Sequence, residues 1–245
     1  QGAVSAGRGL LQFAAVPMNL MVKSGKADYV LSGQFSTKAY KEAARYGDVK
    51  AVASSKEDNF SHIPALDPKE FRPDADYFHI CMNNTIYGTV WHQLPDTGSV
   101  PLVADISSCI LSKPIDVSKF GLLYAGAQKN VAPAGLTIVI VREDLLGEPM
   151  ECTPTMFNYK TMAENDSMYN TPPAGPFTFA SWCWNGSKTT SAGWKKWRSA
   201  MCAKPSFSMI FWTALPCLRL RRQGGPLHYE CDLCHRRQGP GRQVR

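Results

Sequence analysis

The sequence predicts an α/β fold with a mostly parallel sheet over residues 1–173. Short apolar runs of strand length recur in this part of the chain, and one segment has the periodicity of an amphipathic helix. The runs do not alternate with polar residues, which is expected of strands covered on both faces, as in parallel sheets. Polar residues follow several of these runs, at the strand ends where ligands bind in such folds.

Residues 37–47 form the clearest helix candidate. Ser36 precedes the segment and can cap its start, because a serine hydroxyl accepts a hydrogen bond from a free N–H of the first turn. Gly47 can end it, since glycine readily adopts the backbone conformation that terminates helices. The apolar residues on one face are Ala39, Tyr40, Ala43 and Ala44.

Five strand candidates follow this helix, at residues 49–52, 77–81, 102–105, 122–125 and 137–141. Three polar residues stand at or after the carboxyl ends of such strands, namely Thr85, Asp105 and Lys129. Because parallel strands end at the same edge of a sheet, these side chains are expected to lie at that edge.

Lys129 has the most distinctive surroundings. It lies in YAGAQKNVAPAGL, residues 124–136, close after an apolar run. An ammonium is costly to desolvate, so a lysine this close to buried strand residues is unusual. A lowered pKa would make the neutral amine a nucleophile that forms a Schiff base with a carbonyl. The alternative is a solvated loop lysine, the common case for this residue type.

Length and composition narrow the class of protein to which this chain can belong. The chain has 245 residues, enough for one large domain or two small ones. No apolar run approaches the length that spans a bilayer, and the chain opens at Gln1 without a cleavable signal pattern. Its eight cysteines lack a regular framework spacing and favour free thiols in a reducing compartment. We therefore expect a cytoplasmic protein with no membrane partner.

Charge divides the chain at residue 173. Residues 1–173 contain 15 Lys and Arg against 18 Asp and Glu, a net charge of −3, whereas residues 174–245 contain 12 against 2, a net charge of +10. The second part also holds five of the six tryptophans and five of the eight cysteines. A basic, aromatic segment is typical of nucleic-acid binding, which is one interpretation of this tail.

Several motifs between residues 11 and 173 stand in the same order as in one enzyme family. They are QFAAVPMNL at 12–20, SGQFSTKAYKEA at 32–43, NNTIYGT at 83–89, VADISSCILSKPIDVSKFGLLYAGAQKN at 103–130, LTIVIVREDLLG at 136–147 and SMYNTPP at 167–173. Together they resemble phosphoserine aminotransferase, a class-V, fold-type I enzyme that uses pyridoxal phosphate. The resemblance implies the large cofactor-binding domain of that family, a three-layer α/β sandwich, and a homodimer.

The resemblance also implies an activity. Enzymes of this family convert 3-phosphohydroxypyruvate and glutamate into phosphoserine and 2-oxoglutarate, a step of serine biosynthesis. The expected partners are therefore small amino and 2-oxo acids, and nucleic acid is not among them. The alternative is an inactive truncated or frameshifted fragment that at most binds the cofactor.

Four residues take chemical roles by this resemblance. Lys129 is the Schiff-base lysine that also moves a proton between the substrate and cofactor carbons. Asp105 faces the pyridinium nitrogen, whose protonation lets the ring accept electrons, although by itself an aspartate there could cap the following turn. Phe35 replaces a stacking tryptophan, and Thr85 corresponds to a threonine that contacts the ring. Taken alone, these two read as a core phenylalanine and a turn hydroxyl.

The cofactor phosphate is assigned a second group of residues. Gln128 and the pair Gly7 and Arg8 resemble phosphate donors of the same subunit. Asn170 and Thr171 resemble the pair that reaches the partner's phosphate, so each site would be built from two subunits.

Three departures from the family pattern bear on activity. The glycine-rich loop before Gln12 is two residues longer, and an insertion there disturbs N–H groups that must converge on a phosphate. Ala132 stands where a glycine is usual. The family's His-Arg and Arg segments, which hold the phosphate and carboxylate of the substrate, have no counterpart. We therefore expect little transaminase activity from this polypeptide.

Beyond Pro173 the codons fit the family in a shifted reading frame. The shifted frame joins the third base of each codon to the first two bases of the next codon. Because tryptophan has a single codon, few amino acids are possible in the shifted frame around each tryptophan. Residues 181–186 become compatible with LVLEW, 194–198 with LEEME and 209–213 with a DFLD-type run, the family's continuation at about this spacing. The sequence thus predicts that residues 174–245 are out of frame, disordered and poorly packed; a naturally divergent tail is the alternative.

One motif of the tail suggests a metal or haem. Cys231, Cys234 and His235 match the haem attachment pattern C-x-x-C-H, and with His228 they could form half of a zinc site. A closed zinc site needs four ligands, which this stretch lacks. A further frame offset makes it compatible with an MNVTFVT-like family segment, so no metal is expected.

Overall fold

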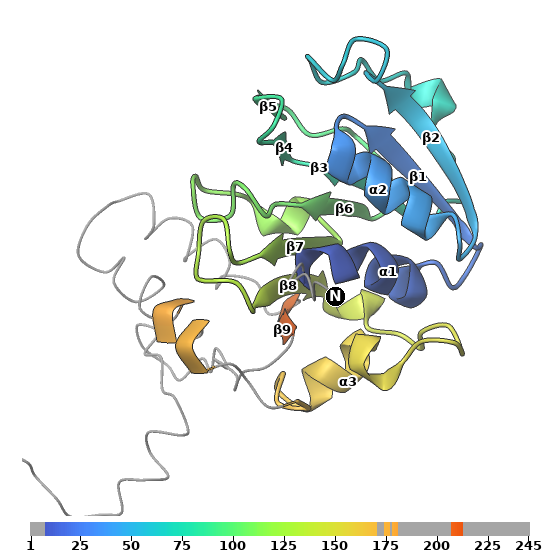
Figure 1. Ribbon diagram of the computed structural model, residues 1–245. Coiled ribbons are helices and arrows are strands. Elements are labelled where there is room, and N and C mark those ends of the chain that lie inside the picture. The colour runs from blue at the N-terminus through green and yellow to red at the C-terminus, as the bar shows by residue number, and fades with distance from the viewer. Residues whose placement is uncertain (1–7, 171–173, 177, 181–206, 213–245) are drawn as a thin grey trace, which may run out of the picture.

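A seven-stranded, mostly parallel sheet organises the fold (Figure 1). The computed structural model describes residues 8–170, 174–176, 178–180 and 207–212. The strand order is β2-β1-β3-β6-β7-β8-β9. The five strands from β2 to β7 are parallel, whereas β8 is antiparallel to both neighbours. The strands are β1 (Lys26–Leu31), β2 (Asp48–Ser54), β3 (Tyr77–Cys81), β6 (Leu102–Asp105), β7 (Leu122–Gly126), β8 (Thr137–Arg142) and β9 (Phe207–Trp212).

The five predicted strands are confirmed as β2, β3, β6, β7 and β8, but the apolar pattern missed β1. Asp28 interrupts the apolar character of β1, yet this carboxylate is fully buried. It accepts hydrogen bonds from the Nε and the backbone N–H of Arg72, at 2.7 and 2.8 Å. A buried charge is tolerated when it is paired in this way, so a strand can carry one.

Helices α1 (Arg8–Leu20) and α2 (Gln34–Ala43) cover one face of the sheet, and α3 (Tyr159–Glu164) lies below them in Figure 1. The predicted position of α2 is wrong by a few residues at each end. Ser36 lies inside the first turn, where its hydroxyl accepts from the backbone N–H groups of Ser32 and Gly33, both at 3.0 Å. The helix stops before Gly47, because the chain must turn there to enter β2 at Asp48.

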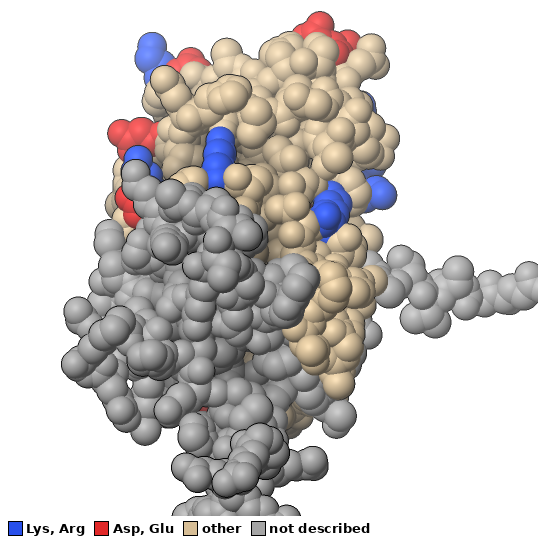
Figure 2. Space-filling view, turned by 90° about the vertical axis from the view of Figure 1, so that its left-hand side faces the viewer, with Lys and Arg blue, Asp and Glu red and all other residues tan. Residues whose placement is uncertain are grey.

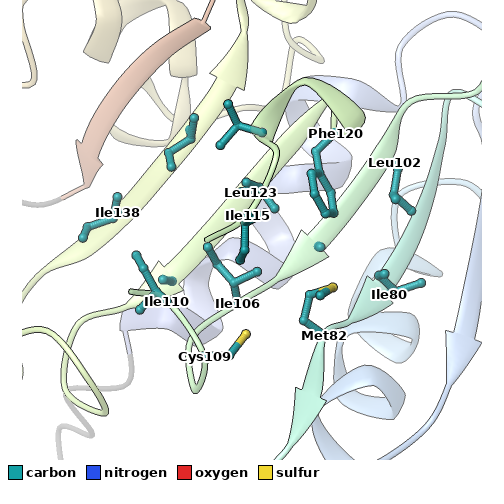
Figure 3. Close-up of a cluster of buried hydrophobic side chains, with 14 of the residues drawn as sticks. Ile80, Met82, Leu102, Ile106, Cys109, Ile110, Ile115, Phe120, Leu123 and Ile138 are labelled. Carbon is teal, nitrogen blue, oxygen red and sulfur yellow. The ribbon is translucent and has the colours of Figure 1, made fainter. Parts of the chain in front are cut away.

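Two apolar clusters fill the two sides of the sheet, as expected for buried parallel strands. One lies between the sheet and α1 and α2. The other lies on the opposite face, under the irregular segments that contain 3₁₀ helices at Pro68–Glu70 and Val117–Lys119 (Figure 3). Its labelled members are Ile80, Met82, Leu102, Ile106, Cys109, Ile110, Ile115, Phe120, Leu123 and Ile138. These two layers hold the sheet from both faces and so fix the position of the edge at which its parallel strands end.

That edge gathers the elements that follow the strands. The start of α1, the start of α2, the small antiparallel pair β4 (Asn83–Asn84) and β5 (Thr89–Val90), and the loops after β6 and β7 all lie on the left of Figure 1. Figure 2 views the molecule from this side, where isolated Lys and Arg side chains stand among uncharged residues of the described surface.

Little of the tail, residues 174–245, falls within the described ranges. The exceptions are residues 174–176 and 178–180, which are helical, and β9. Strand β9 pairs with the whole of β8, from Phe207 beside Arg142 to Trp212 beside Thr137. The remaining tail residues, including the C-x-x-C-H motif at 231–235, lie outside the described part of the chain. None of the described helices has both the length and the apolar character needed to cross a bilayer.

Candidate active site

Asp105 is the last residue of β6 and points to the face covered by α1 and α2. It is 8% exposed and lies between Cys81 of β3 and Tyr124 of β7 in the strand register. The backbone N–H of Ser107 donates to its Oδ1 at 2.9 Å. The carboxyl therefore does cap the turn after the strand, as the simpler interpretation of the sequence required, and is buried as well.

Burial raises the pKa of Asp105 above its ordinary value, because a carboxylate loses its hydration there. The hydrogen bond from Ser107 and the positive charge of Lys129 lower this pKa and so act in the opposite direction. A carboxylate with this balance is stabilised further by any cation placed against it. The position suits a protonated ring nitrogen of a ligand.

Lys129 lies three residues beyond β7 and is itself exposed, whereas the residues up to Ala127 are buried. Its Nζ donates a hydrogen bond to Oγ of Ser108 at 2.8 Å. The hydroxyl of Thr85 donates to the same oxygen at 2.6 Å. Ser108 thus joins two predicted site residues from different loops and uses both of its acceptor positions to do so.

Phe35 completes this group from the first turn of α2. The Nζ of Lys129 lies 4.8 Å from the centre of its ring, within the range of a cation–π contact. The ring is partly exposed and also packs against the apolar cluster between the sheet and α1 and α2. The structure therefore brings Thr85, Asp105 and Lys129 to one edge of the sheet, as predicted, and Phe35 joins them there.

Gln128 folds back over the end of β7. A Cβ on Gly126 would lie 2.7 Å from its Oε1, so no larger residue fits there while the amide keeps this position. The N–H of Gly126 donates to Oγ of Ser107 at 3.0 Å, and Gly9, in the first turn of α1, packs against Gly126. The amide of Gln128 and the first turn of α1 therefore lie near each other, an arrangement suited to an anion.

The remaining predicted phosphate residues are placed less fully. Arg8 begins α1, but its side chain lies outside the described part of the structure. Gly7 and Thr171 lie outside the described residues altogether. Asn170 is exposed in the segment that follows α3.

Sequence reasoning missed three residues that hold the site together. Ser107 and Ser108 directly follow Asp105, so adjacency to a candidate carboxylate was an available signal. Asn84 gives no such signal. It is buried, its Nδ2 donates to Oγ of Ser32 at 3.2 Å and to Oγ1 of Thr89 at 3.0 Å, and a Cβ on Gly33 would clash with it at 2.3 Å. It fixes the start of α2 against the loop that carries Thr85.

The described residues contain no group of three or more His, Cys, Asp or Glu side chains that could hold a metal ion. Their three cysteines, Cys81, Cys109 and Cys152, are free thiols.

Comparisons with known proteins agree with this geometry. A phosphoserine aminotransferase of Lysinibacillus sphaericus is 56% identical over 163 residues, which is 66% of this chain and 45% of that protein. One of Nitrosomonas europaea is 58% identical over 170 residues, 66% of this chain and 46% of that protein. The chain thus spans under half the length of these curated relatives.

A solved structure shows the same fold. The phosphoserine aminotransferase of Bacillus circulans subsp. alkalophilus is 42% identical, with a TM-score of 0.67 over 79% of this chain and 53% of that one. The family model described as aminotransferase class-V matches residues 6–179, which is most of the chain and six residues more than the boundary predicted at 173. With the sheet, the buried aspartate and the lysine in place, the chain belongs to the aminotransferase class-V family.

Proposed function

We propose that this chain is the cofactor-binding part of a phosphoserine aminotransferase that uses pyridoxal 5′-phosphate. The observation that carries the proposal is the placement of buried Asp105, at the end of β6, on the same edge of the sheet as the contact between Lys129 and Phe35. The names of the relatives support the substrate class, since they are phosphoserine aminotransferases at more than 50% identity.

The donor set fits the cofactor. Asp105 supplies a carboxylate for the ring nitrogen, Lys129 an amine for the aldehyde, and Phe35 an aromatic face for the ring. Thr85 supplies a hydroxyl beside the lysine. The phosphate would lie at the start of α1, near the amide of Gln128, where N–H groups and the helix dipole favour an anion.

Each residue then has a defined task. The bound cofactor would supply an electron sink for the carbanion formed at the substrate α carbon. Asp105 keeps the ring nitrogen protonated, and Ser107 holds that carboxyl in place. Lys129 would hold the cofactor through its amine and would move the proton at the α carbon of the substrate. Ser108 positions its Nζ.

The whole enzyme would exchange an amino group between phosphoserine and 2-oxoglutarate, with glutamate and 3-phosphohydroxypyruvate on the other side. We propose a cytoplasmic homodimer in which Asn170 and Thr171 reach the partner's phosphate. The free thiols of the described residues are in keeping with a reducing compartment.

A second candidate is a fragment that binds the cofactor without turnover. The coverage of under half of each relative favours it, because residues that grip the substrate can lie in the part not matched. We also propose that codons beyond residue 173 are out of frame, which the nucleotide sequence would test. A single-base insertion or deletion near codon 174 that restores LVLEW supports this, and a continuous family-like frame without one contradicts it.

The test of cofactor binding is covalent capture. Purified chain is mixed with pyridoxal phosphate, the visible absorbance band is recorded, and borohydride followed by peptide mass spectrometry locates the attached group. We expect attachment at Lys129 and its loss in Lys129→Ala. The control is Lys119→Ala, which changes a lysine just before the amino end of β7. An unchanged band in Lys129→Ala would contradict the proposal.

A further inference from the structure

Two ammonium groups converge on the ring of Phe35 at the candidate site. The Nζ of Lys129 lies 4.8 Å from the ring centre, and the Nζ of Lys38 lies 5.6 Å from it. Both distances are within the range of a cation–π contact. The two nitrogens are therefore at most about 10 Å apart, roughly the Debye length at physiological ionic strength, so their fields add at this edge of the sheet.

The charge of Lys38 is not neutralised by the described residues. The side chain is exposed, and no ion pair among the described residues includes it. The carboxylate one turn further along α2 belongs to Glu42, which has other partners. Its Oε1 accepts a hydrogen bond from the hydroxyl of Tyr46 at 3.0 Å and lies 3.6 Å from Nη1 of Arg45. Lys38 is thus available to a ligand.

The helix starts at this edge contribute in the same direction. The first turn of α1 and the first turn of α2 both lack acidic residues. The positive end of each helix dipole is therefore not offset from within its own helix. Asp105, the candidate carboxylate at this edge, is buried. An anion that approaches Phe35 from solvent meets the two ammonium groups and the start of α2 first.

Helix geometry by itself explains only half of this arrangement. Lys38 follows Phe35 by three residues in α2, and side chains with that spacing are neighbours on any helix. Lys129 reaches the same ring from the loop after β7, which depends on the tertiary fold. An exposed helix lysine is thereby placed beside the amine that the proposed function makes reactive.

We propose that Lys38 is the cation that draws phosphate-bearing ligands to Lys129. A phosphate monoester carries a charge of about −2 at neutral pH, so both ammonium groups attract it, whereas they do not attract an uncharged analogue. Lys38 does not hold the bound phosphate, whose place is at the start of α1. Because it stays in solvent, it acts mainly on the rate at which the ligand arrives. The identity of the ligand rests on the proposed function; the arrangement of charges does not.

The first test needs no cofactor. Lysine side chains labelled with ¹³C at Cε are followed by NMR in the full chain while inorganic phosphate is added, and Lys38→Gln and Lys129→Ala assign the two signals. The signals of Lys38 and Lys129 should shift together. In Lys38→Gln the shift of Lys129 should require about fivefold more phosphate, the size expected when one exposed charge near a dianion is lost.

The control for this titration is Lys119→Gln. Lys119 is also exposed and stands just before the amino end of β7, so the control removes the same charge from the opposite end of the sheet. It should leave the response of Lys129 unchanged. An equal response of Lys129 in the two variants would overturn the inference.

The second test compares two aldehydes that differ only in the phosphate, pyridoxal phosphate and pyridoxal. At low ionic strength Lys38→Gln should slow the attachment of pyridoxal phosphate to Lys129 about fivefold and leave the rate for pyridoxal unchanged. Lys38→Arg, which keeps the charge, should restore the rate, and added salt should reduce the difference because exposed charges are screened. Equal slowing of both aldehydes would mean that the substitution acts through structure and not through charge, against the inference.

The two tests also separate this role from the proposed function. If neither aldehyde attaches to Lys129 in the parent chain but the phosphate titration responds as stated, the proposed function fails and the role of Lys38 stands. Attachment at Lys129, with rates and a phosphate response that do not depend on Lys38, gives the reverse.

Discussion

The ammonium of Lys129 donates a hydrogen bond to the hydroxyl oxygen of Ser108 across 2.8 Å, although the two residues are 21 positions apart. Ser108 comes from the loop after β6 and Lys129 from the loop after β7. Adjacent parallel strands bring these loops together, so the contact depends on the pairing of β6 with β7. It fixes the position of the Nζ of Lys129 at this edge of the sheet.

Ser108→Ala should weaken capture of pyridoxal phosphate by about five- to tenfold, because one hydrogen bond of roughly 1 kcal/mol is lost from Lys129 and Thr85 loses its partner. The melting temperature should change little, since Ser108 is half-buried and leaves only a small gap. Absorbance titration with the cofactor measures the effect. Ser118→Ala is the control, because its hydroxyl bonds Asp116 just before β7 starts. Equal affinities of the two variants would contradict the role of Ser108.

Asp105→Asn should stabilise the cofactor-free chain at neutral pH by about 1 kcal/mol while it weakens cofactor binding. The pKa of folded Asp105 lies above its ordinary value of 3.8, so the folded state holds this proton more tightly than the unfolded state. Stability is therefore lost as pH rises from the unfolded to the folded pKa, and the asparagine variant avoids that loss. The difference in the free energy of unfolding between Asp105→Asn and the parent chain should grow with pH between the unfolded and the folded pKa of Asp105, and then level off.

Urea unfolding between pH 4 and 8 measures the advantage of Asp105→Asn. The exposed Asp58→Asn serves as the comparison. An advantage that is largest at pH 4 would show that the sign is wrong.

Arg72→Leu should destabilise the chain by about 3 kcal/mol or more, because it leaves Asp28 as a buried charge without its partner. Arg72 also bonds the carboxylate of Asp48 at 2.7 Å and the carbonyl of Ala27 at 2.7 Å, so it ties β1 to β2. Urea denaturation gives the free energy of unfolding. Lys50→Ala, which breaks an exposed pair with Glu70, should cost under about 1 kcal/mol. Similar losses in both variants would mean that Asp28 finds another partner.

The 245-residue polypeptide should transfer amino groups at least about 100-fold more slowly than a version restored in frame beyond residue 173 and extended at both ends. Catalysis needs the substrate held in position, and a phosphate and a carboxylate are gripped by paired arginine contacts that scattered tail charges do not replace. A coupled assay with phosphoserine and 2-oxoglutarate compares the two proteins. Comparable turnover would show that the shorter chain already holds its substrate.

The sequence by itself determined the class of fold and the positions of two candidate site residues, Asp105 and Lys129. Its apolar runs located five strands, and the position of Asp105 and Lys129 after such runs placed both at the carboxyl edge. These signals are local, since burial on both faces requires continuous apolar residues wherever the strand lies. The resemblance to the family added proposed roles for Phe35, Thr85 and Gln128.

Tertiary structure decided which polar groups find one another. Strand β1 forms although Asp28 interrupts it, because Arg72, 44 residues away, neutralises that charge. Ser108 joins Thr85 to Lys129, and Tyr124 comes beside Asp105, through the register of neighbouring strands. A buried polar group needs a partner with correct geometry, and that partner is set by strand order and register, which no local pattern of residues contains.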